Sequence, residues 1–303
     1  MKRALVTGAS SGIGKSFSEQ LATQGYELTL VARNQHRLNE LKNTLPGKGH
    51  RILVADLSNA AGIEKVCQEL TGQSYDLLVN NAGLGVYGAF SDTAWDELEF
   101  MYRVNCDALL KLSHAFLKQS KRGDALINLA SVLGFLPFPF GGALYGASKS
   151  FVVSLSQALW EEQRKRGVYV MALCPGSTAT EFFDRAGGDP NKLPPKSITQ
   201  SPGQVVKEAL SALGKQKKPV VVTGAKNKLI VTLARFLSFR MQATLMRNAA
   251  PETSVRLRKS GATEAPSFAL MPRRHDAGLS LDNSRNGNAG SRAKNKPNGS
   301  GLS

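Results

Sequence analysis

Seven short apolar runs alternate with longer amphipathic segments over the first 225 of the 303 residues. The runs are mostly rich in Val, Leu and Ile and predict strands buried on both faces, at residues 3–7, 27–31, 51–54, 77–79, 125–129, 168–174 and 220–222. The segments between them predict helices at residues 15–24, 36–44, 61–70, 95–117, 145–166 and 202–213. Because strand–helix–strand units cross over right-handedly, this order predicts an α/β fold: a doubly wound parallel sheet of about seven strands with helices on both faces.

The positive charge of the chain is concentrated in its C-terminal third. The net charge is +16 at pH 7, and residues after 208 carry +13 of it. Residues 226–248 place Leu229, Leu233 and Phe236 at three- and four-residue spacing among basic residues, so we expect a basic amphipathic helical extension at 226–259. Residues 260–303 are rich in Ser, Asn and Gly and poor in large apolar residues, which predicts a disordered basic tail. The folded domain is then expected at residues 1–225.

Neither the cysteines nor the histidines are spaced as metal ligands. The histidines are scattered, at His36, His50, His114 and His275. The cysteines are odd in number and far apart, which predicts no disulfide framework: Cys67, Cys106 and Cys174. Free thiols fit a reducing compartment, and the first predicted strand begins at residue 3 with no apolar signal segment before it. We therefore expect a cytoplasmic protein with no metal centre.

A glycine-rich turn follows the first predicted strand and opens the first helix. Its residues after Thr7 include Gly8, Ser10, Ser11, Gly12, Ile13 and Gly14. Glycines permit a tight turn and a close approach of the backbone to a pyrophosphate. The free N–H groups at the start of a helix then attract its negative charge. The position of this turn at the end of a strand predicts a dinucleotide-binding site.

The end of the second predicted strand bears on which dinucleotide binds. An NAD site usually has an acidic residue here for the ribose 2′-hydroxyl, but this chain has Ala32 and Arg33. The guanidinium of Arg33 suits a 2′-phosphate, and Arg37 lies one helical turn further on. The alternative is that Arg33 only occupies a surface strand end. We interpret the pair as favouring NADP(H).

Tyr145 and Lys149 lie four residues apart on one predicted helix, and Ser131 precedes Tyr145 by fourteen residues at a strand end. A nearby ammonium favours the phenolate, so we expect Lys149 to lower the pKa of Tyr145 from about 10 toward working pH. Such a tyrosine can give a proton to a carbonyl oxygen during hydride transfer, and Ser131 can hydrogen-bond the same oxygen. This spacing alone often marks only a helix surface. The strand-end serine in a nucleotide-binding fold indicates catalysis.

In their order and spacing these motifs resemble the short-chain dehydrogenase/reductase family over residues 1–225. Further matches are Asp56 with Leu57, the Asn-Asn-Ala-Gly segment at 80–83, Asn105, and the Pro-Gly-Ser-Thr segment at 175–178. The resemblance implies a Rossmann-type fold and a catalytic set of Asn105, Ser131, Tyr145 and Lys149. No member of that set is missing.

The resemblance implies a role for each matched residue. Tyr145 would be the general acid/base, Ser131 would orient the substrate carbonyl, and Lys149 would bind the nicotinamide ribose. Asn105 would hold a water of the proton relay behind Lys149. The implied cofactor contacts beyond the glycine turn are Asp56 and Leu57 at the adenine, Asn81, Ala82 and Gly83 at its ribose, and Pro175, Gly176 and Thr178 at the nicotinamide.

Some of these residues have local alternatives. Asp56 is also placed to cap the following helix, and Thr178 suits simple turn chemistry. The resemblance implies a mobile substrate lid at 177–200. Aromatic residues near the lid and before Tyr145 suggest an apolar substrate pocket, with ordinary core or subunit contacts as the alternative: Phe135, Phe138, Phe140, Phe182 and Phe183, with Leu136 beside them.

These observations predict an NADPH-dependent oxidoreductase that reduces a ketone or aldehyde carbonyl to an alcohol. The basic helical extension and the aromatic loops favour an apolar, lipid-like substrate such as a ketoacyl chain or a steroid. Two alternatives stay open: an NAD(P)-dependent alcohol dehydrogenase running in the oxidative direction, and a non-catalytic NADP-sensing protein. The intact catalytic set argues against the second.

The expected partners follow from the same features. The resemblance implies a homo-oligomer, a dimer or tetramer, formed through the helices that follow Asn81 and Ser131. Nucleic acid is disfavoured because no aromatic platform accompanies the basic tail. For the basic helical extension two interpretations stay open: peripheral contact with a membrane, or packing on the domain or a partner subunit.

Overall fold

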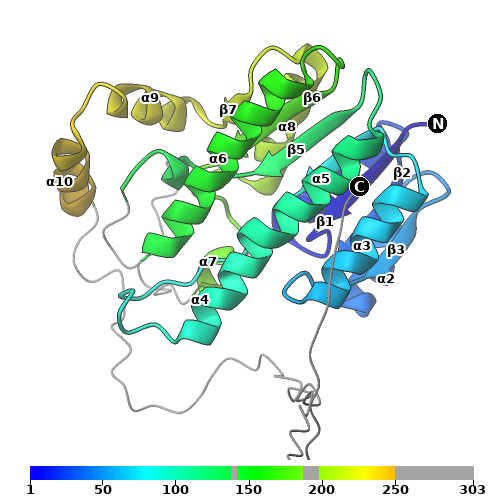
Figure 1. Ribbon diagram of the computed structural model, residues 1–303, viewed down its shortest axis with the longest axis horizontal. Coiled ribbons are helices and arrows are strands. Elements are labelled where there is room, and N and C mark those ends of the chain that lie inside the picture. Colours follow the sequence, from blue (N-terminus) through cyan, green and yellow to red (C-terminus); the bar gives the residue numbers. More distant parts are fainter. Residues whose placement is uncertain (138–141, 187–197, 250–303) are drawn as a thin grey trace, which may run out of the picture. The chain divides into compact units, whose positions relative to one another are not determined.

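Within residues 1–137, 142–186 and 198–249, which the computed structural model describes, a seven-stranded parallel sheet lies at the centre (Figure 1). Its order is β3-β2-β1-β4-β5-β6-β7. The strands are β1 Arg3–Thr7, β2 Glu27–Ala32, β3 Arg51–Val54, β4 Leu77–Asn80, β5 Ala125–Leu129, β6 Tyr169–Cys174 and β7 Val220–Val222. The order reverses between β1 and β4, and such a switch point is where α/β sheets bind ligands.

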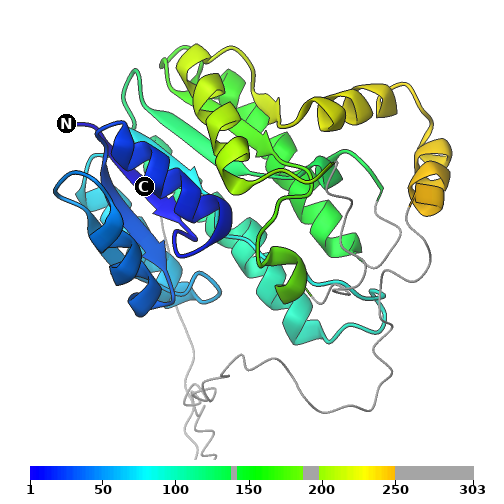
Figure 2. The ribbon, with the colours of Figure 1, turned by 180° about the vertical axis from the view of Figure 1, so that it is seen from behind.

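Helices cover both faces of this sheet, as Figures 1 and 2 show from opposite sides. One face carries α1 (Gly12–Thr23), α2 (Gln35–Thr44) and α8 (Pro202–Lys215). The other carries α3 (Ala60–Gly72), α5 (Leu109–Gln119) and α6 (Ala143–Gln163). Buried side chains such as Phe17 on the first face and Phe116 on the second pack against inward residues of the strands. The predicted doubly wound α/β fold is confirmed.

The predicted strands agree closely with the observed ones. β1, β3, β5 and β7 have the predicted bounds, and β2, β4 and β6 differ by one residue. The agreement has a physical basis, because strands buried on both faces are continuous apolar runs. Four helices begin earlier than predicted: α1 at Gly12 and α6 at Ala143 by three and two residues, and α2 and α3 by one residue each.

The segment predicted as one helix at 95–117 changes helix type along its length. It consists of α4 (Trp95–Tyr102), a π-helical stretch η1 (Arg103–Ala108), and α5. Short π-helical stretches are rare and occur often at functional sites. Asn105, one of the predicted catalytic residues, lies within η1 and is buried.

The helical piece predicted at 226–248 is two helices rather than one. They are α9 (Ala225–Ala234) and α10 (Phe239–Ala249). The Gln242 side chain of α10 donates hydrogen bonds to the carbonyls of Ala234 and Leu237, at 2.8 and 3.0 Å, and so closes the end of α9. Both helices follow the β7 edge of the sheet (Figures 1 and 2). Residues 250–259 of the predicted extension and the predicted disordered tail at 260–303 lie outside the described residues.

Candidate active site

The glycine turn at the end of β1 has a backbone that other residues would strain. Gly8 and Gly12 have φ angles of +65° and +55°, in the left-handed region that favours glycine. A Cβ atom on Gly14 would lie 2.3 Å from the carbonyl oxygen of Gly8. α1 starts at Gly12, so its first N–H groups belong to this turn. The arrangement fits the pyrophosphate of a dinucleotide.

Two side chains bind this turn to the end of β4, across the switch point. Thr7 Oγ1 accepts hydrogen bonds from the backbone N–H groups of Asn81 and Ala82, at 3.0 and 2.9 Å. The Asn81 side-chain amide donates back to the carbonyl of Thr7 at 2.9 Å. The predicted cofactor residues of the first and fourth strands are therefore brought together, with the Asn81 amide holding the backbone of the turn.

The end of β2 presents the cations that were predicted for a 2′-phosphate. Arg33 directly follows β2, is exposed, and has its guanidinium carbon 5.7 Å from the centroid of the Phe100 ring. Arg37 lies in the first turn of α2, and its Nη1 is 3.2 Å from Glu181 Oε2. Arg185 also pairs with Glu181. The hydrogen bond from Arg37 and the charge of Arg185 lower the pKa of Glu181, a residue that no sequence motif had indicated.

The structure decides one of the alternatives for Asp56. Its Oδ1 accepts hydrogen bonds from the backbone N–H and the hydroxyl of Ser58, at 3.0 and 2.8 Å. The cap of α3 is Asn59, whose side chain accepts from the N–H of Gly62 at 2.9 Å. The interpretation of Asp56 as that cap is therefore wrong. Leu57 beside it is buried.

The four predicted catalytic residues, Asn105, Ser131, Tyr145 and Lys149, are all buried and come together from η1, the end of β5 and α6. Tyr145 and Lys149 are one turn apart on α6, with Lys149 Nζ 5.7 Å from the centroid of the Tyr145 ring. Lys149 Nζ donates to the carbonyl of Leu129 at 2.9 Å. Ser131 is the N-cap of the short 3-10 helix η2 (Val132–Gly134), and its Oγ accepts a hydrogen bond from the N–H of Leu133 at 3.2 Å.

Burial dominates the protonation of this pair. It raises the pKa of Tyr145, and the neighbouring Tyr87 and Ser131 have smaller effects, raising and lowering that pKa respectively. Burial also lowers the pKa of Lys149, to about 8. The expectation that Lys149 lowers the pKa of Tyr145 is wrong in this structure, because a buried site disfavours both charged forms. Tyr145 therefore carries its proton at neutral pH.

Asn105 binds the loop after β4 through both ends of its side-chain amide, and its Nδ2 also donates to Ser148 Oγ at 3.3 Å. Its Nδ2 donates to the carbonyl of Leu84 at 2.9 Å, and its Oδ1 accepts from the N–H of Leu84 at 3.0 Å. A Cβ on Gly83 would lie 3.2 Å from Asn105 Oδ1 and 3.4 Å from Lys149 Nζ. The Asn-Asn-Ala-Gly segment thus reaches from the glycine turn to the catalytic residues.

Aromatic rings surround Tyr145. The ring of Phe182, in the short helix α7 (Phe182–Arg185), has its centroid 5.5 Å from that of Tyr145. Tyr87 lies 6.3 Å from Tyr145 and 6.0 Å from Phe183, measured between ring centroids. Tyr87 was not predicted, because it lies in an irregular loop with no motif around it. The three rings give the site an apolar side.

Other predicted residues have mixed outcomes. Thr178 Oγ1 donates to the carbonyl of Gly176 at 3.1 Å, so its turn chemistry is real, and Pro175 and Gly176 directly follow β6. Phe135 packs against a buried cluster that includes Val152 and Val153, which is the core alternative. Phe138, Phe140 and residues 187–197 of the predicted lid lie outside the described residues.

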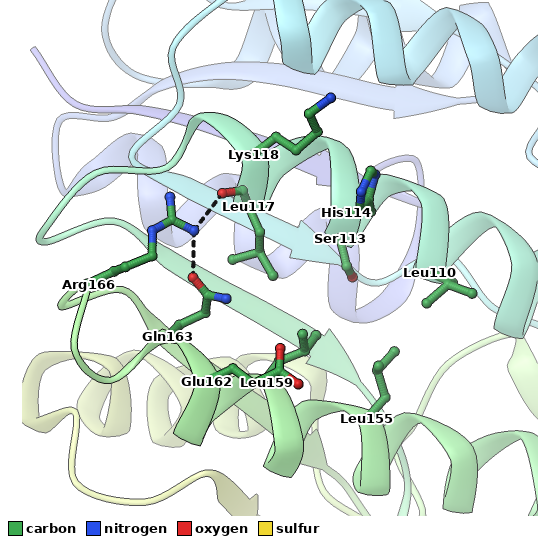
Figure 3. Close-up of a pocket in the computed structure, with 10 residues that line it drawn as sticks. All are labelled: Leu110, Ser113, His114, Leu117, Lys118, Leu155, Leu159, Glu162, Gln163 and Arg166. Atoms are coloured by element: carbon green, nitrogen blue, oxygen red, sulfur yellow. Dashed lines mark hydrogen bonds between the residues drawn. The ribbon is translucent and has the colours of Figure 1, made fainter.

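A separate groove of about 300 Å³ lies between α5 and α6 (Figure 3). Leu110, Leu117, Leu155 and Leu159 form much of its lining, and charged side chains surround them. None of the predicted catalytic residues lines this groove. It lies on the helices that the resemblance implies for subunit contact.

Comparison with known proteins agrees with this geometry. The sequence model of the short chain dehydrogenase family matches residues 2–190. The chain belongs to the short-chain dehydrogenase family. It is an oxidoreductase that acts on CH–OH groups with NAD(P) as acceptor.

Several members of the family are similar to this chain, over between about half and nearly all of their own length. A 7beta-hydroxysteroid dehydrogenase of Mediterraneibacter gnavus is 30% identical over 233 residues, covering 75% of this chain and 88% of that protein. A very-long-chain 3-oxoacyl-CoA reductase of Pyricularia oryzae is 36% identical, over 55% of this chain and 53% of that one. A short-chain dehydrogenase from Sphingobium yanoikuyae, solved with NADPH, is 32% identical with a TM-score of 0.69, covering 83% of this chain and 98% of that one.

Gly14→Ala tests the glycine turn of this short-chain dehydrogenase. The added methyl group overlaps the Gly8 carbonyl, so we expect the free energy of unfolding to fall by about 1–3 kcal/mol and the nicotinamide dinucleotide to bind about tenfold more weakly or worse. Urea denaturation and fluorescence titration measure the two effects. Gly214→Ala in α8 is the matched control, because a Cβ there meets no atom within 4 Å. Equal NADPH affinity in the two variants would contradict this account of the turn.

Proposed function

We propose that this chain is an NADPH-dependent reductase of ketone or aldehyde carbonyls on apolar, lipid-like substrates such as ketoacyl chains or steroids. The observation that carries the proposal is the group of Ser131, Tyr145 and Lys149, buried together, with Lys149 Nζ 5.7 Å from the centroid of the Tyr145 ring. In the direction of reduction the Tyr145 hydroxyl is the proton donor.

The residues present fit a nicotinamide dinucleotide. The glycine turn offers a helix N-terminus to the pyrophosphate, and Arg33 after β2 and Arg37 in the first turn of α2 are assigned to the adenosine ribose and its 2′-phosphate. Asp56 and Leu57 are assigned to the adenine, and Ala82 with Gly83 to its ribose. Pro175, Gly176 and Thr178 are assigned to the nicotinamide. The bound nicotinamide supplies the hydride.

Each catalytic residue has a distinct task in the proposed reaction. Tyr145 donates its hydroxyl proton to the carbonyl oxygen, and the Ser131 hydroxyl hydrogen-bonds that oxygen. Lys149 binds the nicotinamide ribose, and its ammonium stabilises the phenolate that forms on Tyr145. Asn105 holds the relay water through its backbone carbonyl, since its amide group is bonded on both sides to Leu84.

The substrate class is supported by the site and by the relatives. Tyr87 and Phe182 place rings beside Tyr145, and the ring of Phe183 lies beside Tyr87. Two of the relatives are named for a hydroxysteroid and for a very-long-chain oxoacyl thioester. Large apolar substrates gain affinity by burying their surface against such rings.

The test of the function is NADPH oxidation, followed by absorbance, over 3-oxoacyl thioesters, steroid ketones, long-chain aldehydes and small diketones. Tyr145→Phe should lose at least about a thousandfold in kcat, because the proton donor is gone, while NADPH affinity stays near that of the wild type. Tyr102→Phe, at an exposed position on α4, is the matched control and should keep full activity. Turnover retained in Tyr145→Phe, or no turnover on any carbonyl despite tight NADPH binding, would contradict the proposal.

Arg33 is proposed to bind the 2′-phosphate, so NADPH is proposed over NADH. The relative solved with NADPH supports this choice. Arg33→Ala should raise the KM for NADPH about tenfold or more and leave that for NADH unchanged, because only NADPH loses a charge-assisted hydrogen bond. Arg103→Ala, which removes an exposed arginine from a different helix, is the control. An equal change for both cofactors would assign Arg33 a structural role.

The pH dependence of reduction should follow Lys149. Its pKa of about 8 means that the ammonium is present below pH 8 and lost above it. We expect kcat/KM to be level near pH 7 and to fall about tenfold per pH unit well above pH 8. Lys149→Arg keeps its charge at high pH, so its profile should lack this fall even if the level is lower. The same fall in Lys149→Arg would exclude Lys149 as its origin.

We also infer a homo-oligomer, dimer or tetramer, assembled through α5 and α6. The groove between them is lined by leucines, and Leu110 and Phe151 on these helices are exposed apolar side chains. Exposed apolar patches of this kind mark association surfaces.

A further inference from the structure

The helix α9 is apolar on two opposite faces. Asn227, Val231 and Ala234 lie on its buried face. Leu229 and Leu233 lie on the other face and are exposed, and Phe236, in the turn directly after α9, is exposed by 83%. A helix at the edge of a domain ordinarily presents polar residues outward. The outer face of α9 therefore lacks the polarity that contact with water favours.

The helix α10 continues this pattern. Its exposed apolar side chains are Phe239, Met241 and Leu245, with Phe239 exposed by 71%. We call the exposed side chains of residues 225–247 the α9–α10 surface. Large apolar side chains gathered on a surface mark an interaction site rather than ordinary exposure.

The charges of this surface have one sign. Residues 225–249 contain no Asp or Glu and five cations: Lys226, Lys228, Arg235, Arg240 and Arg247. Lys228 pairs with Glu208, at 2.7 Å. Within residues 1–137, 142–186 and 198–249, no ion pair involves the other four. Apolar side chains flanked by unpaired cations match a surface that is negative outside and hydrocarbon inside.

We propose that the α9–α10 surface docks on an anionic lipid bilayer. No helix among the described residues is long and apolar enough to cross a membrane, so the contact is at the bilayer surface. Phe236 and Phe239 enter the boundary between headgroups and acyl chains, while the arginines contact lipid phosphates. A second copy of this chain fits less well, because two such surfaces bring ten cations together without a carboxylate.

The location of this surface connects it to the active site. Phe239 and Gln242 of α10 line a cavity of about 280 Å³ together with residues 133–137 and the first turns of α6. α6 carries Tyr145 and Lys149. Docking therefore brings the loop before Tyr145 close to the bilayer. The idea that docking delivers lipid-like substrates to the active site rests on the proposed function. Binding to vesicles does not depend on that function.

Vesicle co-sedimentation of the full chain tests the proposal. We expect sedimentation with vesicles of phosphatidylcholine mixed with phosphatidylglycerol, little with phosphatidylcholine alone, and a decrease as salt screens the charges. The triple variant Arg235→Glu, Arg240→Glu, Arg247→Glu should bind about tenfold more weakly or worse. Leu233→Ser with Phe236→Ser should also lower binding, which separates the apolar contribution from the charge.

The matched control reverses three cations elsewhere on the chain. The control is the triple variant Lys215→Glu, Lys217→Glu, Lys218→Glu, which changes the net charge by the same amount as the arginine triple variant. Its substitutions precede β7, whereas α9 follows β7, and the tail is unaltered. This control should bind as the wild type does. Thermal unfolding and NADPH titration of every variant show that each is folded.

Three results would overturn the inference. The first is wild-type binding in the arginine triple variant, and the second is an equal loss in the lysine triple variant. The third is self-association of the wild type without any vesicle binding. If light scattering shows association that rises with protein concentration and that Leu233→Ser with Phe236→Ser abolishes, the surface binds a second copy of the chain. Because vesicle binding is measured without turnover, failure of the carbonyl panel leaves this result standing.

Discussion

The bond between the ends of β1 and β4 is the constraint on which the site depends. The glycines of the turn have no side chains, and the side chains of Thr7 and Asn81 supply hydrogen bonds that join the turn to the end of β4. The two residues that follow Asn81 then lead to Leu84, whose backbone is bonded twice to Asn105. Asn105 in turn donates to Ser148 of α6 at 3.3 Å. One chain of hydrogen bonds thus runs from the cofactor turn to the helix that carries Tyr145.

A second network of hydrogen bonds between polar side chains holds α5 and α6 against β4 and β5. Asn80 Nδ2 donates to Asn128 Oδ1 and to Ser113 Oγ, both at 3.0 Å, and Asn128 Nδ2 donates to Ser156 Oγ at 3.0 Å. These groups join β4 and β5 to α5 and α6, so neither helix can shift without leaving buried polar groups unpaired. The network therefore sets the positions of Tyr145 on the inner side of α6 and of the leucine groove on its outer side.

The sequence alone predicts two parts of this structure: the strands themselves, and the polar residues that lie at the ends of the strands. Buried parallel strands are continuous apolar runs, so their bounds are readable, and a polar residue directly after such a run lies at the ligand edge. Ser131 and Arg33 were found in this way. Tyr87 and Glu181 were not, because each reaches the site from irregular backbone and across a long sequence separation. The π-helical turn at Asn105 and the break between α9 and α10 also leave no periodicity to detect.

The protonation of the site could not be predicted from the spacing of Tyr145 and Lys149, because their burial is a property of the whole fold. Burial disfavours each charged form separately. It raises the pKa of Tyr145, so the phenol keeps its proton, and it lowers the pKa of Lys149, so the ammonium loses its proton more readily. In the proposed reaction this balance changes when Tyr145 gives up its proton to a substrate. A phenolate then forms near an ammonium in a buried site, and their attraction is stronger there than in water. The same burial that keeps Tyr145 protonated before the reaction therefore strengthens the ion pair that follows it, provided that Lys149 is still charged.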